Sequence, residues 1–268
     1  MHPSLAHSLP AYLAAWLCAG VVGVAVGFIW AARHGFPARR TVLALLCAVV
    51  TILAGSKILY LLESQLYPAD DYVPVVLRGS LHGFRIPGGM LLLALATPPV
   101  CRTLGLPWRR FGDLLIPLAA GALVLIRLGC FLNGCCFGKV SSLPWSVRFP
   151  RGTWAFLYHR ERGWIGASAT HSLPVHPLQL YFVAAAVFTL MVLLWRSRHE
   201  PQPGSLQLLF YALFFVSTAL IEPLRQNFLT LNNYLVLPAG ILFTVLLIYF
   251  SAMGRVSSYH QRTIYRCR

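Results

Sequence analysis

Seven apolar runs, most of them about as long as a bilayer is thick, constrain this chain more than any other feature of its sequence. They lie at roughly 12–32, 41–62, 86–101, 112–131, 178–195, 205–222 and 232–251. A helix needs about 20 residues to cross the hydrocarbon core, with a range of about 17–25. The third run is short and begins with Pro87, Gly88 and Gly89, which indicates a broken or re-entrant start. We therefore expect an all-α, polytopic membrane protein with about seven transmembrane helices.

The composition supports the same fold class. Of the 268 residues, 57% are hydrophobic and 11% are charged, whereas an ordinary soluble domain carries about a quarter charged residues. With so few charged side chains, most of the surface has to face lipid. We expect residues 1–268 to form a single integral-membrane domain, with no separate soluble domain.

The positive charge of the chain is large. Its 22 Lys and Arg residues against 7 Asp and Glu residues give a formal net charge of +15. The basic residues are scattered between apolar runs and do not gather on one face, so we expect no nucleic-acid partner. Membrane lipids with anionic head groups are the partners that this charge indicates.

Short basic connections alternate with longer ones along the chain. If seven helices are counted, the basic segments all fall on one side of the membrane: 33–40, 102–110, 196–199 and 255–268. Because short cytoplasmic loops are enriched in Lys and Arg, this pattern predicts an external N-terminus and a cytoplasmic C-terminus. The opposite side then holds 63–85, 132–177 and 223–231.

The connection at 132–177 is the longest, and long loops are usually functional or disordered. It also places arginines on the side where the topology rule disfavours them: Arg148, Arg151, Arg160 and Arg162. Binding of an anionic head group is one reason for arginines to be kept there.

The stretch RLGCFLNGCCFG, residues 127–138, begins inside the fourth apolar run. Its arginine, Arg127, has a planar fork of donors that matches phosphate oxygens. Asn133 and Gly134 favour a turn with positive φ, and glycines such as Gly138 let backbone amides approach an anion. Gly88 and Gly89 offer the same backbone exposure. This pattern predicts a site for a phosphate-bearing head group.

Other polar residues interrupt or border the apolar runs. Glu222 and Arg225 close the sixth run, and His176 and Tyr181 lie in the segment HPLQLY at the start of the fifth. Ionisable residues in spans are costly and usually functional. The alternatives are snorkelling or pairing between helices for the charged residues, and a helix-entry cap or buried hydrogen bond for His176.

Three motifs in this order resemble the prolipoprotein diacylglyceryl transferase family of bacterial inner membranes: RLGCFLNGCCFG, LPWSVRFP and HPLQLY. Shorter segments that are similar to the family pattern support the resemblance, namely GSKILYLL at 55–62, IPGGM at 86–90 and LIEPLRQN at 220–227. The resemblance covers most of the chain, from about residue 40 to about residue 250.

The resemblance implies a fold, a reaction and a location. The family has seven helices with an external N-terminus, in the bacterial plasma membrane, and an active site that faces the outer leaflet. Its enzymes move the diacylglyceryl group of phosphatidylglycerol onto the thiol of the lipobox cysteine in a prolipoprotein, and glycerol phosphate leaves. This step belongs to lipoprotein biosynthesis, and it implies no metal and no organic cofactor.

The resemblance also assigns roles to residues of this chain. Arg127 matches the arginine that stabilises the departing phosphate. The predicted catalytic set also contains Glu222, His176 and Tyr181. In this set, His176 or Tyr181 accepts the proton of the acceptor thiol. Together with Arg127, the predicted phospholipid-binding residues are Gly88, Gly89, Asn133, Gly134, Gly138 and Arg225.

Six positions depart from the family pattern. They are Pro87 in place of His, Cys130 in place of Asn, Cys135 in place of Glu, Phe182 in place of Glu, Phe214 in place of Tyr and Thr218 in place of Arg. His82 is a candidate to replace the lost imidazole. A second interpretation follows, in which the chain is a divergent paralogue with a cysteine-dependent or a non-catalytic, lipid-binding role.

Cys130, Cys135 and Cys136 form a possible thiol site on the side where disulfides persist. Several roles stay open for these three residues. They can be small buried apolar residues, and Cys130 can form a disulfide with Cys135 or Cys136. The set can also bind a thiophilic metal or carry an acyl or glyceryl group.

Overall fold

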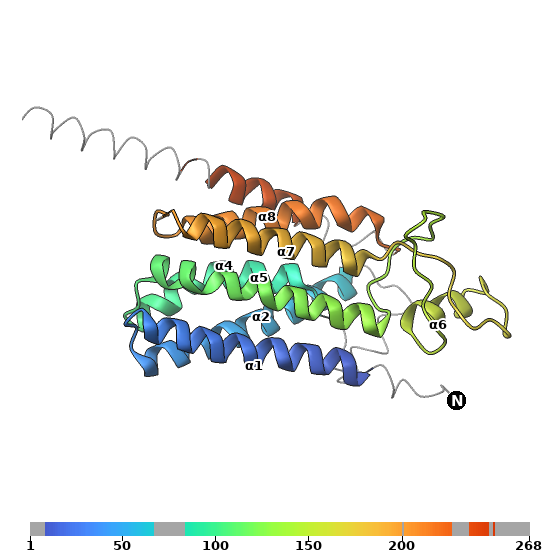
Figure 1. Cartoon of the computed structure of the whole chain (residues 1–268), viewed down its shortest axis with the longest axis horizontal. Helices are drawn as coiled ribbons and strands as arrows, with labels where there is room; N and C mark the ends of the chain where they lie inside the picture. The colour runs from blue at the N-terminus through green and yellow to red at the C-terminus, as the bar shows by residue number, and fades with distance from the viewer. Residues whose placement is uncertain (1–8, 67–83, 200, 227–235, 247–248, 250–268) are drawn as a thin grey trace, which may run out of the picture.

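The computed structural model describes residues 9–66, 84–199, 201–226, 236–246 and 249 of the chain. In these ranges the long helices lie side by side in one bundle, and a short helix lies beyond one end of it (Figure 1). The helices are α1 (Leu9–Arg33), α2 (Ala38–Leu66), α4 (Ile86–Thr103), α5 (Trp108–Asn133), α6 (Trp154–Glu161), α7 (Leu178–Ser197) and α8 (Ser205–Ile221), followed by the 3-10 helix η1 (Glu222–Leu224) and a further helix at Val236–Leu246.

The expected fold class is confirmed, because five helices are long and apolar enough to cross a membrane. The five spans are Ala14–Arg33, Ala38–Glu63, Trp108–Asn133, Leu178–Ser197 and Ser205–Leu224. The third and seventh apolar runs correspond to α4, which has 18 residues, and to the shorter apolar helix at Val236–Leu246. The chain is therefore a multi-pass membrane protein.

The start of α4 differs from the expectation of a broken or re-entrant span. The helix runs without a break from Ile86, and Pro87 occupies its first turn. A proline is well tolerated there because the first N–H groups of a helix have no partner within the helix. The proline therefore begins the span.

The outer face of the bundle is apolar. Leu17, Met191 and Leu220 are 67%, 57% and 74% exposed, while Phe210 and Leu193 are fully buried between helices. Large exposed apolar side chains on every long helix would be a liability in water. In a bilayer they meet hydrocarbon, so the distribution agrees with the membrane assignment.

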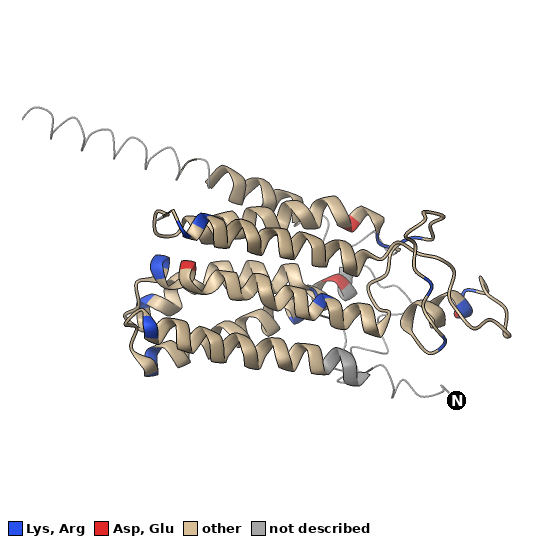
Figure 2. Cartoon of the chain, viewed as in Figure 1, with Lys and Arg blue, Asp and Glu red and all other residues tan. Residues whose placement is uncertain are grey.

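Basic side chains collect at the end of the bundle where α1 leads into α2, α4 into α5 and α7 into α8 (Figure 2). The opposite end holds α6, the connections around it and the beginning of α1 (Figure 1). We refer to these two ends as the basic end and the α6 end. The arrangement is the one expected from the alternation of short basic and long connections.

A buried carboxylate joins two helices at the basic end. Asp113 of α5 is 9% exposed and accepts hydrogen bonds from the backbone N–H groups of Gly204 and Gln207, at 2.5 and 2.9 Å. These groups lie at the beginning of α8, where N–H donors have no partner within the helix and the helix dipole favours a negative charge. Asp113 therefore caps α8 from a neighbouring helix.

We expect Asp113→Ala to destabilise the bundle by about 1–3 kcal/mol, because two buried N–H donors and a favourable charge at the helix dipole lose their partner. Thermal unfolding of the purified protein in detergent measures this loss. Glu161→Gln, which removes an exposed carboxylate on α6, is the matched control and should leave the unfolding temperature unchanged. Equal stability of Asp113→Ala and the wild type would contradict the capping role.

Candidate active site

Backbone hydrogen bonds at the α6 end bring the sequence motifs together. The Gly138 N–H donates to the His176 carbonyl at 3.0 Å, and the His176 N–H donates to the Lys139 carbonyl at 3.0 Å. On its other side, the Lys139 N–H donates to the Leu224 carbonyl at 2.8 Å, beside a bridge between Gly138 and Arg225. The stretch that follows α5 therefore lies between the entry of α7 and the exit of α8.

Two of the predicted glycines are required by the path of the backbone at this junction. Gly134 caps α5 in the left-handed conformation, with φ 64° and ψ 20°, and a Cβ atom on it would come within 2.7 Å of Thr153. A Cβ atom on Gly138 would come within 2.6 Å of the His176 side chain. Both positions need glycine for folding, and lipid binding at them stays a prediction.

The other two predicted glycines, Gly88 and Gly89, lie in the contact between α4 and α2. A Cβ atom on Gly88 would come within 2.5 Å of the Gly55 carbonyl oxygen, and one on Gly89 would come within 2.6 Å of the Ile52 carbonyl oxygen. The sequence interpretation gave these glycines to a lipid head group, but the structure gives them a packing role. Their small size lets two helix backbones approach closely.

The end of α8 carries a buried ion pair. Arg225 binds Glu222 through two hydrogen bonds, at 2.5 Å from Nε and 3.1 Å from an Nη atom. The side chains are 11% and 5% exposed. Arg127 and Arg85 also act on Glu222 electrostatically, and Arg85 itself pairs with Glu63, at the end of the α2 span. Positive and negative charges from four elements thus meet in one buried group.

Arg127 lies inside the bundle at the end of α5 and is 6% exposed. Its guanidinium carbon is 4.0 Å from the centroid of the Phe182 ring, which is a close cation–π contact. In the described part of the chain it has no hydrogen-bond acceptor and no ion-pair partner. A buried guanidinium without an acceptor is costly, so an anionic group would be bound favourably here.

The guanidinium of Arg127 borders a small cavity of about 20 Å³ between α5, α7 and α8, together with Thr189, Ser217 and Thr218. That volume holds one water-sized group. A phosphate is larger, so its binding at Arg127 needs a shift of Phe182 or of the arginine side chain.

A second, much larger cavity lies between α1, α2, α4 and α5, with a volume of about 730 Å³. Its walls are almost wholly apolar, from Trp16 and Met90 near the α6 end to Cys101 and Gly112 near the basic end. Ile126, the residue before Arg127, also lines it. Its volume lies in the usual range for small-molecule sites.

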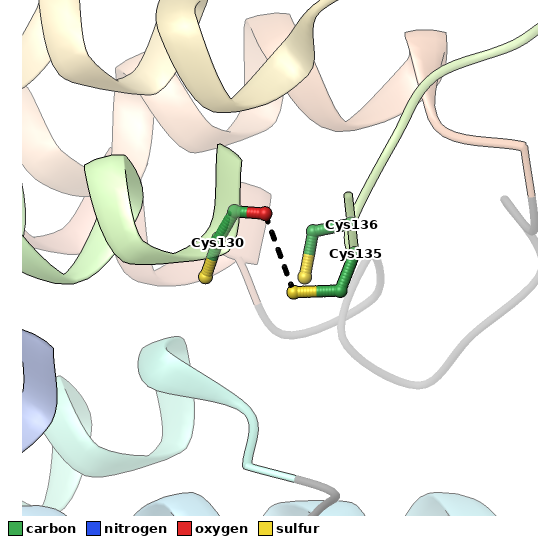
Figure 3. Close-up of side chains that lie close together, drawn as sticks. All are labelled: Cys130, Cys135 and Cys136. Atoms are coloured by element: carbon green, nitrogen blue, oxygen red, sulfur yellow. Dashed lines mark hydrogen bonds between the residues drawn. The ribbon is translucent and has the colours of Figure 1, made fainter. Parts of the chain in front are cut away.

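The three cysteines converge after the end of α5 (Figure 3). The Sγ atoms of Cys130, Cys135 and Cys136 all lie within 4.8 Å of one another, and each cysteine is a free thiol in this structure. The Cys135 thiol faces the Cys130 carbonyl oxygen at 3.6 Å (Figure 3). The cysteine cluster, as we call these three residues, is therefore a compact group with three sulfur ligands.

The positions of the cluster are fixed from outside. Fully buried Gln179, from the HPLQLY segment, donates a hydrogen bond to the Cys135 carbonyl at 2.6 Å. Cys136 has φ 61°, a left-handed conformation that residues with a Cβ atom adopt at an energetic cost. Such conformations persist where the surrounding structure imposes them, and they are frequent at functional sites.

The pKa values of the two half-buried thiols, Cys135 and Cys136, are shifted in opposite directions. The pKa of Cys136 lies well below the usual value, because the neighbouring Cys130 and Cys135 thiols and the positive charges of Arg225 and Arg127 favour its thiolate. The same thiol contacts and burial raise the pKa of Cys135. Burial lowers the pKa of Arg225, but Glu222 and Cys136 outweigh it and raise the pKa. Cys136 is thus the member of the cluster whose surroundings most favour the thiolate.

His176 and Tyr181 form a separate polar group. The His176 Nδ1 atom and the Tyr181 hydroxyl are 3.2 Å apart, and the Trp145 Nε1 atom donates to the same hydroxyl at 2.8 Å. Within the ranges that the structure describes, neither residue forms a hydrogen bond or ring contact with Arg127 or with the cysteine cluster. Their role as proton acceptors stays a prediction.

The predicted site residue Asn133 is 3% exposed, and its Oδ1 atom lacks a hydrogen-bond donor among the described residues. A buried acceptor of this kind can receive a hydroxyl group of a ligand. His82, the candidate for the missing imidazole, lies outside the described residues.

Sequence reasoning missed three contacts of this site. Phe182 was noted only as a departure from a pattern, although it stacks on Arg127. Glu63 and Arg85 were counted in a connection between spans, although they form an ion pair. The opposite charges of Glu63 and Arg85, at the two ends of one connection, were the sequence signal for this ion pair. Nothing in the local sequence pointed to Gln179 as the residue that holds Cys135.

Comparison with known proteins gives a consistent result. Residues 5–256 match the profile of a family described as prolipoprotein diacylglyceryl transferase. A relative from Ralstonia pickettii is 31% identical over 219 residues, which are 75% of this chain and 71% of the relative. One from Clostridium tetani is 28% identical over 183 residues, 67% of each chain. Both relatives bear the name phosphatidylglycerol–prolipoprotein diacylglyceryl transferase.

The thiol geometry predicts that Cys136 reacts with iodoacetamide at a lower pH than Cys135 in reduced, chelator-treated protein. Cys135→Ala removes a neighbouring thiol that favours the Cys136 thiolate, so the midpoint for Cys136 alkylation should rise by about 1 pH unit. Mass spectrometry of peptides after timed alkylation measures both midpoints. Cys47→Ala, which removes an exposed cysteine of α2, is the control. Identical midpoints in wild type and Cys135→Ala would contradict the assignment.

Proposed function

The chain belongs to the prolipoprotein diacylglyceryl transferase family, and we propose that it transfers the diacylglyceryl group of phosphatidylglycerol to a lipobox cysteine thiol of a prolipoprotein. One observation carries the proposal. Arg127 is buried near the Glu222–Arg225 pair, and among the described residues it forms no salt bridge and no hydrogen bond through its side chain. A phosphoester is the anion that the family's donor lipid would supply.

The two cavities accommodate different parts of the donor lipid. The acyl chains occupy the apolar cavity of about 730 Å³, which extends through the bundle. The head group then lies at the α6 end, where Ile126 of the cavity wall adjoins Arg127 in the chain. The unpaired Oδ1 atom of Asn133 accepts a hydroxyl of the glycerol head group, and Phe182 moves aside to admit the phosphate to Arg127.

The reaction is an alkylation of sulfur. The acceptor thiolate attacks the glycerol carbon that bears the phosphoester, a C–S bond forms, and the C–O bond breaks with its electron pair passing to the phosphate oxygen. Glycerol phosphate leaves. The guanidinium of Arg127 stabilises the charge that develops on that oxygen, because a fixed cation in a water-poor site acts strongly on it.

Arg225 and Glu222 act together in this proposal. Arg225 donates two hydrogen bonds to Glu222, which fix its guanidinium, so its positive charge stays directed at the site as a second clamp for the phosphate. His176 and Tyr181 relay the proton of the acceptor thiol, and the 3.2 Å contact between them supports a relay. The lipid-binding glycines of this site are Gly134 and Gly138.

The proposed location is the bacterial plasma membrane, with the site toward the outer leaflet. The basic connections at the opposite end of the bundle support this orientation, because positive loops stay in the cytoplasm. Phosphatidylglycerol and the lipobox segment would both be accessible from the α6 end.

A specific observation favours a second candidate function. Two residues of the cysteine cluster, Cys130 and Cys135, occupy positions where the family pattern has Asn and Glu, which supports a paralogue that carries out a cysteine-dependent reaction or binds lipid without catalysis. The two candidates differ in one property, since only the first restores lipoprotein maturation.

The test is rescue of a bacterium depleted of its own transferase. Wild-type chain should restore growth and lipoprotein modification, whereas Arg127→Ala should fail, with a transfer rate in membranes lower by about 10²–10³-fold. Arg110→Ala, which removes an exposed arginine at the basic end of the same helix, α5, is the matched control and should rescue. Immunoblots of membranes confirm equal insertion of all three proteins.

Failure of an inserted wild-type chain to rescue would overturn the transferase assignment in favour of the paralogue. Rescue by Arg127→Ala would overturn the role of Arg127 while leaving the transferase assignment in place.

A further inference from the structure

The geometry of the cysteine cluster matches that of a metal site. A zinc ion binds thiolates at about 2.3 Å, which separates two sulfurs on a tetrahedral zinc by about 3.8 Å. The three Sγ atoms already lie within 4.8 Å of one another. Small side-chain rotations therefore suffice to bring all three onto one ion.

The type of ligand limits the choice of metal. Three sulfur ligands without oxygen or nitrogen favour zinc or copper(I) over magnesium, calcium or manganese. Zinc bound to three thiolates has one negative charge in excess, and copper(I) bound to three thiolates has two. Around the cluster, Arg127 and Arg225 act on Cys136 and Glu222 pairs with Arg225, which leaves one positive charge in excess. A zinc ion bound to three thiolates carries one negative charge in excess, which balances this positive charge.

The supports of the cluster suit a preorganised site. Cys130 belongs to the last turns of α5, and the Cys135 N–H donates to the Cys130 carbonyl at 3.2 Å. Gln179 of α7 fixes the Cys135 carbonyl. Backbone bonds next to Cys136 attach the following residues to α7 and α8. Ligands that are held by several elements bind a metal with little ordering cost.

We propose that Cys130, Cys135 and Cys136 bind one zinc ion through three thiolates, and that its fourth coordination position takes the acceptor thiol of the transfer reaction. The identity of that fourth ligand rests on the proposed function, whereas zinc binding does not. Three protein ligands with one open position is the usual composition of a catalytic zinc site.

Such a site would supply the acceptor thiolate directly. A thiol that coordinates zinc loses its proton, which passes to water, and the bound sulfur then attacks the glycerol carbon of the donor. The C–S bond forms as the C–O bond breaks, and glycerol phosphate carries away the electron pair. In the described part of the chain, His176 and Tyr181 form no hydrogen bond or ring contact with Arg127 or with the cysteine cluster. In this inference zinc therefore activates the acceptor thiol in place of the relay through His176 and Tyr181.

Metal analysis of the full-length protein, purified in detergent under reducing conditions with zinc present, tests the proposal. Wild type should retain about one zinc ion per chain after desalting. Cys135→Ser and Cys136→Ser should bind zinc at least about 10-fold more weakly. Cys47→Ser, a single cysteine change on an exposed face of α2, should retain the metal.

Cobalt(II) substitution gives a readout that does not depend on variants that fold poorly. Wild type loaded with cobalt(II) should show sulfur-to-metal charge-transfer absorption and the visible bands of a tetrahedral ion. A lipobox peptide should change those bands, and the same peptide with Ser in place of its Cys should not. Wild type stripped with a chelator should also unfold at a lower temperature than the zinc-loaded protein.

The outcomes separate the two proposals. Zinc binding without transferase rescue would overturn the proposed function and keep the zinc site. Full transferase activity of chelator-treated wild type and of Cys136→Ser would overturn the role of zinc in binding the acceptor thiol and keep the function. Wild type without zinc, with copper(I) in its place, or with a disulfide among the three cysteines that persists under mild reduction would overturn the zinc inference.

Discussion

The buried pairing of Glu222 with Arg225 is the interaction on which the α6 end of the bundle depends. Transfer of an ion from water into a protein interior costs several kcal/mol, and two hydrogen bonds from one guanidinium offset much of that cost for both partners. Each carboxylate oxygen of Glu222 accepts a hydrogen bond from Arg225 and forms none with Arg127. Arg127 is therefore left with an aromatic ring and a small cavity, in an environment that favours an incoming anion.

The cysteine cluster changes the chemistry that this charge arrangement can support. Its three sulfurs lie close to the two arginines, so the site combines cations that suit a phosphate with thiolates that suit a soft metal. A phosphate group and an acceptor sulfur must come together in any diacylglyceryl transfer. The structure brings arginines suited to the phosphate and thiols suited to chemistry at sulfur to the same end of the bundle, the α6 end.

The fold was predictable because it follows from apolar runs and from the positions of arginines, which are local properties of the sequence. Arg127, Glu222, Arg225 and the cysteines were predicted for the same reason, since buried charges and grouped thiols are conspicuous. The packing of Gly88 and Gly89 against α2 was not predicted, because a pair of glycines looks alike in sequence whether it faces a ligand or another helix, and their head-group role stays a prediction. Contacts such as Phe182 with Arg127 depend on how helices pack, which no local pattern specifies.

The most direct measurement is a crystal structure of the protein with phosphatidylglycerol bound in a lipid phase. The account predicts that a phosphate oxygen lies about 3 Å from a guanidinium nitrogen of Arg127, with the acyl chains in the cavity between α1, α2, α4 and α5. A head group bound at the basic end, or a phosphate at the α6 end beyond hydrogen-bonding distance of Arg127, would contradict it.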